Sequence, residues 1–362
     1  MKTTKLLAVS ATAVLALAAA ACGSDDSSPS GGASGGGTIN GAGATFPQPI
    51  YSEWAARFKA QKGTTVNYQG IGSGGGIAQF TAATVDFGAS DAAMTDEELQ
   101  AAEKKGRPVH VPTVLGAVTI SYNVHGVGKG LRLDGTTAAD IFLGKITRWD
   151  DAAIKALNPG LNLPGTDITV CHRSDESGTT KNFLQFLADY SPAWANGPGV
   201  DKSVKWPTGT GAKGNDGVAG CIKQSDGAIG YVEQAYALQN DFTYAAVKNK
   251  AGRFVTPTLA ATSAAAEGTR PPRDLRFSTI DGPGAKTYPI SAITFLLVYQ
   301  DMCKAGMARP AAQRTTAWLS WDLNKGQQIA PQLQYAPLPA SIKTMARAKV
   351  HGLRCNGAPL KG

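Results

Sequence analysis

One stretch of the chain combines residue types that suit the binding of an oxyanion. Residues 171–180 have the sequence CHRSDESGTT and stand between a β-branched run and a helical pattern, so a strand ends there and a helix begins. The guanidinium of Arg173 is a planar donor fork that fits an oxyanion, and Asp175 is placed to hold it. The helix start adds free N–H groups and a partial positive charge, and further donors come from Ser177, Gly178 and Thr179. Taken alone, such a stretch is more often an ordinary Ser- or Thr-capped helix beside a surface Arg.

Two further loops of this kind occur in the first half of the chain. Thr45 and Phe46 follow an expected strand and precede an expected helix. Ser73 lies in a glycine-rich loop, before a helix that the pattern predicts from Ile77. Ligands of open α/β sheets bind where the carboxyl ends of the strands meet such loops. If the three loops converge, they form a site for a small anion.

A carboxylate ends the next expected strand, residues 85–91. Beside an anion, Asp91 would repel the ligand unless the ligand has a proton to donate. Phosphate keeps at least one O–H near neutral pH and sulfate keeps none, so Asp91 would accept a hydrogen bond from phosphate and discriminate against sulfate. The alternative is that Asp91 caps the turn before the next helix, and the residue alone slightly favours that alternative.

The N-terminus indicates export. A basic start and an apolar run over residues 6–21, too short to span a membrane comfortably, end in the pattern AAAC. Residues 1–21 are therefore predicted to be a signal peptide. Cys22 is predicted to be acylated, with residues 22–37 as anchor and flexible Gly/Ser-rich linker. The protein would then be tethered to the outer face of the cell membrane. Ordinary cleavage after Ala21 is the alternative, and it would leave a free secreted or periplasmic protein.

Composition narrows the class of protein further. A length of 362 residues suggests about two domains. Four more cysteines in an exported chain suggest two disulfides with three possible pairings, among Cys171, Cys221, Cys303 and Cys355. The four His are scattered and no cysteine has metal-ligand spacing, so neither a metal nor a cofactor is expected. Lys and Arg are not clustered with aromatics, so no nucleic-acid partner is expected.

The order of the expected elements predicts the fold class. Strands that alternate with helices indicate an α/β protein with largely parallel sheets. Two long extended runs, near 113–121 and 287–299, are expected to cross between two lobes. The Pro-, Gly- and Ala-rich residues 249–286 are expected to be mostly irregular.

From about residue 38 to its C-terminus the chain closely resembles the PstS-type phosphate-binding proteins, the substrate-binding subunits of bacterial phosphate ABC importers. The motifs that carry the resemblance follow the same order: GAGATFP at 41–47, NYQGIGS at 67–73, VDFGASD at 85–91, LGKI at 143–146, SGT at 177–179, GNDG at 214–217 and AIGYVE at 228–233.

This resemblance implies a two-lobed periplasmic-binding-protein fold of type II, an α/β fold with a hinge between two open sheets flanked by helices. Lobe I would comprise residues 38–117 and 290–362, and lobe II residues 118–289. A disulfide between lobes would restrain their closure. The fold therefore implies one bridge within each lobe, with the pairs Cys171–Cys221 and Cys303–Cys355.

The resemblance also implies a set of ligands for one phosphate ion: Thr45, Phe46, Ser73, Asp91, Arg173, Ser177, Gly178 and Thr179. Asp175 would orient Arg173. Two positions depart from the family pattern. Gly74 stands where a second Ser is common, and Glu176 stands where Gly is expected, which puts an extra negative charge near the mouth of the site.

The function that follows is that of a lipid-anchored, monomeric receptor without catalytic residues, which delivers phosphate to the membrane permease subunits of an ABC importer. Two alternatives remain open. One is a secreted phosphoesterase with Ser177 as nucleophile, although the sequence places no base beside it. The other is a binding protein for another oxyanion, such as sulfate or molybdate.

Overall fold

The computed structural model describes residues 36–361 of the chain, and one long strand, β4 (Pro108–Asn123), joins two sets of strands in it. The order along the main sheet is β2 (Thr65–Gly70), β1 (Thr38–Gly43), β3 (Phe87–Ser90), β12 (Ser291–Tyr299), β4, β8 (Ala228–Glu233), β6 (Thr169–Arg173) and β7 (Thr210–Ala212). The first part of β4 pairs antiparallel with β12 (Ser291–Tyr299), and its last part, from Val118, pairs antiparallel with β8 (Ala228–Glu233). At this change of partner, the N–H of Val118 donates to the carbonyl of Ile290 at 2.8 Å.

The first strand set also contains the parallel strands β1 (Thr38–Gly43), β2 (Thr65–Gly70) and β3 (Phe87–Ser90). Each of them is followed by a helix: α1 (Gln48–Lys62), α2 (Ser73–Ala82) and α3 (Asp96–Glu103). A capping box opens α3, with Thr95 and Glu98 as its partners.

The start of α2 differs from the prediction, because the helix begins at Ser73 and not at Ile77. The glycines that suggested a loop form the first turn of the helix. A Cβ on Gly76 would lie only 2.7 Å from the carbonyl oxygen of Ala89 in β3. Glycine therefore lets this helix start lie directly against the sheet.

The second strand set continues from β8 with β6 (Thr169–Arg173), which is parallel to it, and then β7 (Thr210–Ala212). Its helices are α4 (Gly135–Phe142), α5 (Ala152–Leu157), α6 (Gly178–Tyr190), α7 (Pro192–Asn196), α8 (Gly214–Gln224) and α9 (Gln234–Gln239). Short strands complete it: β9 (Thr243–Tyr244) beside β4, and a small sheet of β5 (Arg132–Leu133), β10 (Ala246–Lys248) and β11 (Phe254–Val255).

The segment 249–286, predicted to be mostly irregular, contains a helix, α10 (Leu259–Ala266). Thr258 caps it by accepting a hydrogen bond from the N–H of Ala261 at 3.1 Å. Its alanines have high helix propensity, which outweighs the Pro- and Gly-rich character of the flanking residues.

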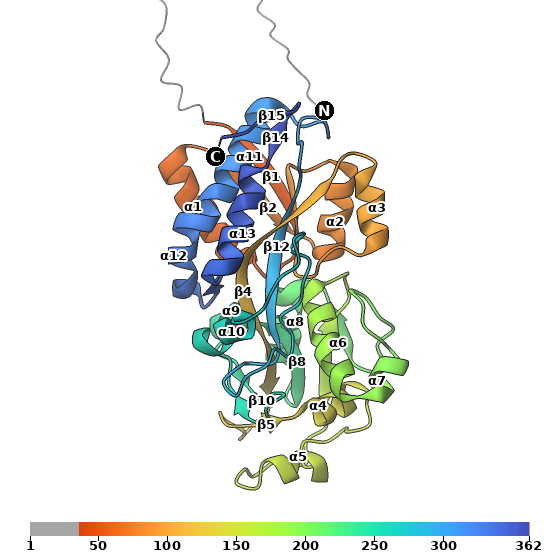
Figure 1. The fold of residues 1–362 in the computed structure, drawn as a ribbon. Coiled ribbons are helices and arrows are strands. Elements are labelled where there is room, and N and C mark those ends of the chain that lie inside the picture. Colours follow the sequence, from red (N-terminus) through yellow and green to blue (C-terminus); the bar gives the residue numbers. More distant parts are fainter. Residues whose placement is uncertain (1–35, 362) are drawn as a thin grey trace, which may run out of the picture. The chain divides into compact units, whose positions relative to one another are not determined.

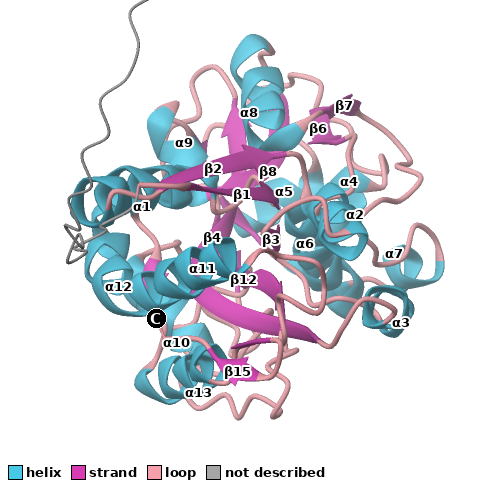
Figure 2. Ribbon diagram, turned by 90° about the horizontal axis from the view of Figure 1, so that it is seen from above, coloured by secondary structure: helices cyan, strands magenta, loops and turns pink. Residues whose placement is uncertain are grey.

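The C-terminal elements return to the first strand set, where α11 packs against α1 (Figure 1). They are α11 (Arg309–Trp321), α12 (Gln327–Ile329) and α13 (Ala340–His351), with strand β13 (Ala336–Pro337) and the hairpin β14 (Arg354–Cys355) and β15 (Ala358–Pro359). The indole of Trp54 in α1 meets that of Trp318 edge-on at 6.4 Å and donates to the carbonyl of Gly326 at 3.1 Å. From above, the helices surround the buried strands (Figure 2).

Both predicted disulfide pairings are present. Cys171 in β6 is joined to Cys221 in α8, and Cys303 after β12 is joined to Cys355 in β14. Each bridge therefore lies within one strand set. Each closes a loop of about 50 residues, which is worth about 4 kcal/mol in the chain-entropy model.

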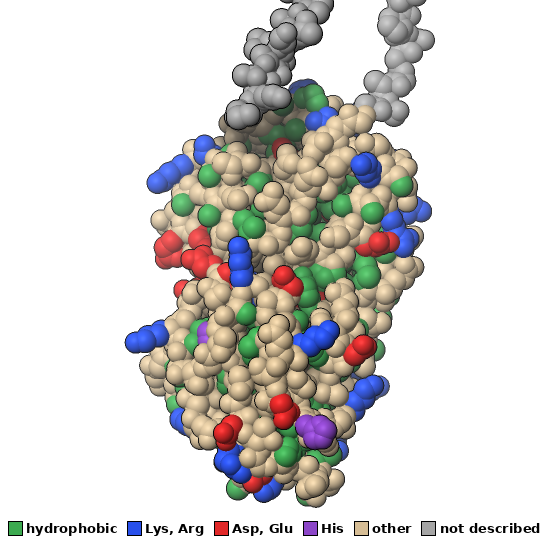
Figure 3. Space-filling model, turned by 180° about the vertical axis from the view of Figure 1, so that it is seen from behind, with side chains coloured by type: hydrophobic (Ala, Val, Ile, Leu, Met, Phe, Trp, Pro, Cys, Tyr) green, Lys and Arg blue, Asp and Glu red, His purple; other side chains and the backbone are tan. Residues whose placement is uncertain are grey.

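The predicted signal peptide, Cys22 and most of the linker lie outside the described residues. In residues 36–361, no helix has the length and apolar character needed to cross a membrane. On the face shown in Figure 3, Lys and Arg side chains are spread over the surface, with Asp and Glu side chains among them.

Candidate functional site

The structure brings the three predicted loops together, although they belong to different strand sets. Thr45 lies between β1 and α1, Ser73 opens α2, and Ser177 precedes α6. The clearest contact between the sets is a hydrogen bond of 3.0 Å from the N–H of Gly178 to the hydroxyl oxygen of Ser73. The carboxyl ends of β1, β3 and β6 therefore meet at one buried place.

Arg173 supplies a buried positive charge to this place, being only 3% exposed. Its Nε donates to Oδ1 of Asp175 at 2.7 Å, and its Nη2 bonds the other carboxylate oxygen. Burial opposes ionisation of Asp175, but Arg173 outweighs it, so the pKa of this carboxyl lies below its usual range. The remaining nitrogen, Nη1, is buried without a partner among the described residues. A buried donor of this kind calls for an acceptor.

Asp91 supplies a buried carboxyl opposite this guanidinium. Its Oδ1 accepts from the hydroxyl of Thr294 in β12 at 2.9 Å, and its backbone carbonyl accepts from the amide of Asn182 at 2.7 Å. Burial raises the pKa of Asp91 to about 7, although the Thr294 hydroxyl and the charge of Arg173 act in the opposite direction. The turn-capping alternative is wrong, because Thr95 caps α3 and the Asp91 carboxyl is held by β12.

The start of α6 is both a capped helix and part of the site. The hydroxyl oxygen of Ser177 accepts from the N–H of Thr180 at 3.1 Å, as an N-cap does. A Cβ on Gly178 would lie 2.6 Å from the Ser73 hydroxyl oxygen and 2.8 Å from Cβ of Asp91. Glycine is therefore required for the close approach of α6 to the first strand set.

Asn215, at the start of α8, belongs to the site and was missed by sequence reasoning. Its backbone N–H and its Nδ2 both donate to the hydroxyl oxygen of Thr45, at 3.1 and 2.8 Å, and Nδ2 also reaches that of Thr179 at 3.3 Å. Its Oδ1 is fixed by the N–H of Glu233 at 2.9 Å. Two donors occupy the Thr45 oxygen, so the Thr45 hydroxyl proton is directed to another acceptor. The available signal was the GNDG motif at 214–217, to which no role had been given.

Tyrosines hold the turn at Thr45 and Phe46 from behind. The hydroxyl of Tyr236 donates to the carbonyl of Thr45 at 2.6 Å, and that of Tyr335 donates to the carbonyl of Phe46 at 2.7 Å. Tyr335 also lies 2.9 Å from the buried carboxylate of Glu233, whose pKa is raised well above its usual range by burial. The turn is therefore fixed by a tyrosine of α9 and by a second tyrosine just before β13.

The two departures from the family pattern face each other. A Cβ on Gly74 would collide with the side chain of Glu176, while the N–H of Gly74 donates to the carbonyl of Glu176 at 3.1 Å. Glycine at 74 therefore makes room for glutamate at 176, whose side chain is exposed.

An ion pair beside the site also connects the strand sets. Nζ of Lys202 lies 2.6 Å from Oε1 of Glu98, and the lysine side chain is only 6% exposed. The carbonyl of Lys202 accepts from the N–H of Ser177 at 2.8 Å. The start of α6 is thus linked to the capping box of α3.

No nucleophile and base are assembled around Ser177 in the described residues. The nearest histidine in sequence, His172, has its Nδ1 3.0 Å from the carbonyl of Arg173 and stacks on Trp206 with ring centroids 4.5 Å apart. Within residues 36–361, no group of three or more His, Cys, Asp or Glu side chains is arranged to hold a metal ion. The site is suited to hold an anion with several donors and one proton acceptor.

Comparison with known proteins places the chain among bacterial and archaeal relatives. A model of the PBP superfamily domain matches residues 28–323. The chain is 44% identical over 309 residues to the phosphate-binding protein PstS of Xylella fastidiosa (84% of this chain, 82% of that one). It is 42% identical over 317 residues to PstS of Haemophilus influenzae (86% and 92%), and 36% identical over 326 residues to PstS of Methanocaldococcus jannaschii (84% and 83%).

Solved structures agree in fold. One similar chain is a high-affinity periplasmic phosphate-binding protein solved with phosphate, at TM-score 0.70 and 24% identity (86% of this chain, 93% of that one). Another is a phosphate-binding protein from Stenotrophomonas maltophilia, at TM-score 0.68 and 22% identity with the same coverage. At these identities the likeness is one of fold: a mixed α/β periplasmic-binding-protein architecture.

Proposed function

The chain belongs to the PBP superfamily and, within it, to the PstS phosphate-binding proteins, and we propose that its buried site binds one inorganic phosphate ion. As a PstS protein it is the substrate-binding component of a phosphate ABC transporter and not an enzyme. The ligands that we propose are Thr45, Phe46, Ser73, Asp91, Arg173, Ser177, Gly178 and Thr179.

The observation that carries this assignment is the free nitrogen of Arg173. Asp175 occupies the edge of the guanidinium formed by Nε and Nη2, so Nη1 is the nitrogen that remains for a ligand. A charge-assisted hydrogen bond to an oxyanion contributes about 1.5–3 kcal/mol. The start of α6 and the hydroxyls of Thr45 and Thr179, oriented by Asn215, add further donors.

Asp91 is proposed to accept the proton of the bound phosphate. Thr294 holds Oδ1, which leaves Oδ2 for the ligand. A phosphate ion with one O–H matches this acceptor, whereas sulfate would place an oxygen without a proton against it. This contrast supports phosphate over the alternative of a sulfate-binding protein.

Binding is proposed to close two lobes, residues 38–117 with 290–362 and residues 118–289. Within residues 36–361, the chain would cross between these lobes twice, at Val118 in β4 and just before β12 at Ile290. Because β4 changes its partner from β12 to β8 at this point, the two crossings offer a hinge. The hydrogen bond between Gly178 and Ser73 and the ion pair between Lys202 and Glu98 would then form on closure. The closed form is the one that we expect the permease to recognise.

We also propose that the protein is exported as a monomer and anchored to the outer face of the cell membrane through acylated Cys22. The support is the AAAC pattern and the linker that follows it. Mass spectrometry of the mature N-terminus tests this directly. An acylated N-terminal cysteine is expected, and an unmodified N-terminus at residue 22 would contradict the anchor.

Titration calorimetry with phosphate, arsenate and sulfate tests the site. We expect tight binding of phosphate and arsenate and none of sulfate. Arg173→Met should abolish phosphate binding, whereas Arg253→Met, which removes an exposed positive charge from the same half of the chain, should not. Equal binding of sulfate and phosphate would refute the role of Asp91, and unchanged affinity in Arg173→Met would refute the assignment.

A further inference from the structure

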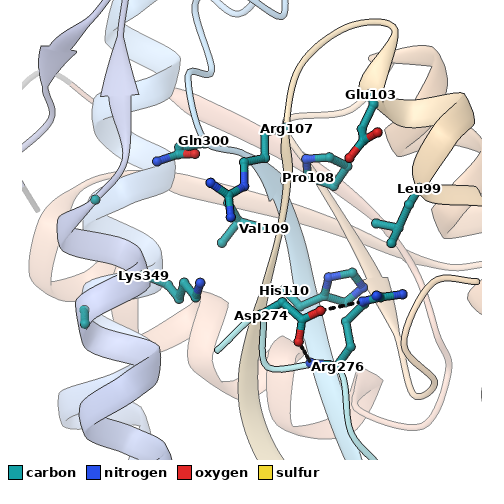
Figure 4. A pocket seen from close by; sticks show the side chains of 12 residues that line it. Leu99, Glu103, Arg107, Pro108, Val109, His110, Asp274, Arg276, Gln300 and Lys349 are labelled. Carbon is teal, nitrogen blue, oxygen red and sulfur yellow. Dashed lines mark hydrogen bonds and ion pairs between the residues drawn. The ribbon is translucent and has the colours of Figure 1, made fainter. Parts of the chain in front are cut away.

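A second cavity, of about 380 Å³, opens between α3, the start of β4 and the end of α13 (Figure 4). Its volume lies in the range of small-molecule sites. None of the residues that line it is among the proposed phosphate ligands, so the two sites are separate. Most of the charged and polar side chains on its wall come from segments far apart in the chain: Arg107, His110, Asp274, Arg276, Gln300 and Lys349.

Two positive charges in this cavity lack a counter-charge. The side chains of Arg107 and Lys349 point into the same space (Figure 4), and neither makes an ion pair in residues 36–361. Arg276 differs, because its Nε lies 2.9 Å from Asp274 and its Nη1 lies 2.9 Å from Asp96. Like charges that converge without an anion repel each other, so an anion between Arg107 and Lys349 would be favourable.

Two carboxylates also line this space, Glu103 and Asp274, and Asp274 lies between Lys349 and Arg276 in Figure 4. Glu103 lines the cavity from α3, on the opposite side of β4 from Lys349 in Figure 4. The carboxylate of Asp274 is already held by Arg276. Three cationic side chains against two carboxylates leave the lining of the cavity with a net positive charge.

A buried histidine adds a neutral donor to this wall. His110 is 2% exposed, and its Nε2 accepts from the N–H of Met94 at 3.1 Å. In the neutral ring the proton must then be on Nδ1. Burial, helped by the charge of Arg276, lowers the pKa of His110 to about 4, so the ring stays neutral at physiological pH. An imidazole in this state donates a hydrogen bond without adding charge.

The frame of the cavity is held rigidly. The N–H of Gln300 donates to the carbonyl of Arg107 at 2.9 Å, and the N–H of Arg354 donates to the carbonyl of Gln300 at 2.8 Å. Just beyond, the disulfide between Cys303 and Cys355 joins the end of β12 to the hairpin that follows α13. A wall that is fixed before binding loses little entropy when a ligand enters.

We propose that this cavity is a binding site for a compact polyanion, a small molecule with two or more negatively charged oxygen groups. Arg107 and Lys349 each take one anionic group, and His110 and Gln300 donate to the remaining oxygens. Condensed phosphates and small polycarboxylates share this chemistry, and the cavity has room for more than one oxyanion group. The proposal does not depend on the phosphate assignment, because the residues differ.

Calorimetry on the purified protein tests the proposal, with saturating phosphate present so that the phosphate site is occupied. Pyrophosphate and citrate are titrated separately. We expect saturable binding of at least one of them, with one ion per chain, and a loss of at least about tenfold in the double variant Arg107→Gln, Lys349→Gln. Binding of pyrophosphate alone would identify condensed phosphates as the class, and binding of citrate alone polycarboxylates.

A matched double variant, Lys62→Gln and Lys343→Gln, removes the same charge from helices α1 and α13 outside the cavity. It should bind the polyanion as the parent does, and phosphate affinity should be unchanged in both double variants. The proposal is overturned if neither probe binds saturably, or if the matched variant loses as much affinity as the cavity variant.

Discussion

Replacing Asp91 by Asn should relax the discrimination between phosphate and sulfate far more than it weakens phosphate binding. In the parent, the carboxylate is proposed to accept the proton of phosphate and to oppose sulfate, which has none. The amide of Asn keeps an acceptor oxygen for Thr294, whose hydroxyl lies 2.9 Å from Oδ1 of Asp91. Its NH₂ group can donate to either anion.

The magnitudes follow from the kind of hydrogen bond. Phosphate exchanges a charge-assisted bond for a neutral one, a loss of about 1–1.5 kcal/mol or roughly tenfold in affinity. For sulfate, the variant removes the negative charge of Asp91, which is buried at 2% exposure and would have no proton to pair with. Its removal should strengthen sulfate binding by at least about 3 kcal/mol, or roughly a hundredfold. The ratio of the two affinities should therefore fall by about a thousandfold.

The variant also has a pH signature that does not involve a ligand. In the folded protein, burial raises the pKa of Asp91 from 3.8 to about 7. A raised carboxyl pKa means that stability is full below the unfolded pKa and is lost as pH rises towards 7, by about 4 kcal/mol in total. Asn does not titrate, so Asp91→Asn should become more stable than the parent as pH rises from 4 to 7.

Calorimetry with each anion and urea unfolding across this pH range measure both effects. Asp189→Asn removes an exposed carboxylate from α6 and serves as the control, with no expected change in discrimination. An equal loss of affinity for phosphate and sulfate would refute the role of Asp91 as proton acceptor. A stability difference from the parent that does not vary with pH would refute its burial.

Three further variants have distinct expected results. Asn215→Ala should weaken phosphate binding by about 10–100-fold in calorimetry because the hydroxyls of Thr45 and Thr179 both lose the side-chain donor Nδ2, and a change below about twofold would contradict this. Lys202→Met should weaken phosphate binding about fivefold, because the ion pair with Glu98 no longer favours closure. Small-angle scattering with limiting phosphate should show more of the open form than in the parent. Titrations and scattering identical to those of the parent would exclude a role of Lys202 in closure. Replacing the Cys303–Cys355 pair by Ser should lower the free energy of unfolding by about 4 kcal/mol in urea without changing phosphate affinity, and unaltered unfolding would show that the bridge adds no stability.

Much of the site was predictable because it lies at the ends of regular elements. The pattern of a strand, a Gly/Ser/Thr loop and a helix marks Thr45, Ser73 and Ser177, and each does lie at or beside a helix start. The start of α2 was misplaced because a run of glycines has low helix propensity in isolation. In the fold, those glycines are needed for contact of Gly76 with β3.

Other parts of the site depend on residues far apart in the chain. Asn215 and Thr45 are separated by 170 positions, and Thr294 and Asp91 by 203. No local pattern specifies such a pair, since the partners meet only when β4 and β12 have joined the strand sets. The facing of Gly74 and Glu176 has the same origin, which is why the two departures look unrelated in sequence.

The stretch from Arg173 to Thr179 contains both features that follow from the local sequence and features that depend on tertiary packing. Its local form, a strand end, a guanidinium held by Asp175 and a capped helix, follows from neighbours within a few residues and could be predicted from the sequence. That Nη1 of Arg173 is buried without a partner among residues 36–361, and that Gly178 lies against Ser73, depends on the three-dimensional packing. Burial and contact between distant loops arise from packing, and they turn a capped helix into one side of an anion site.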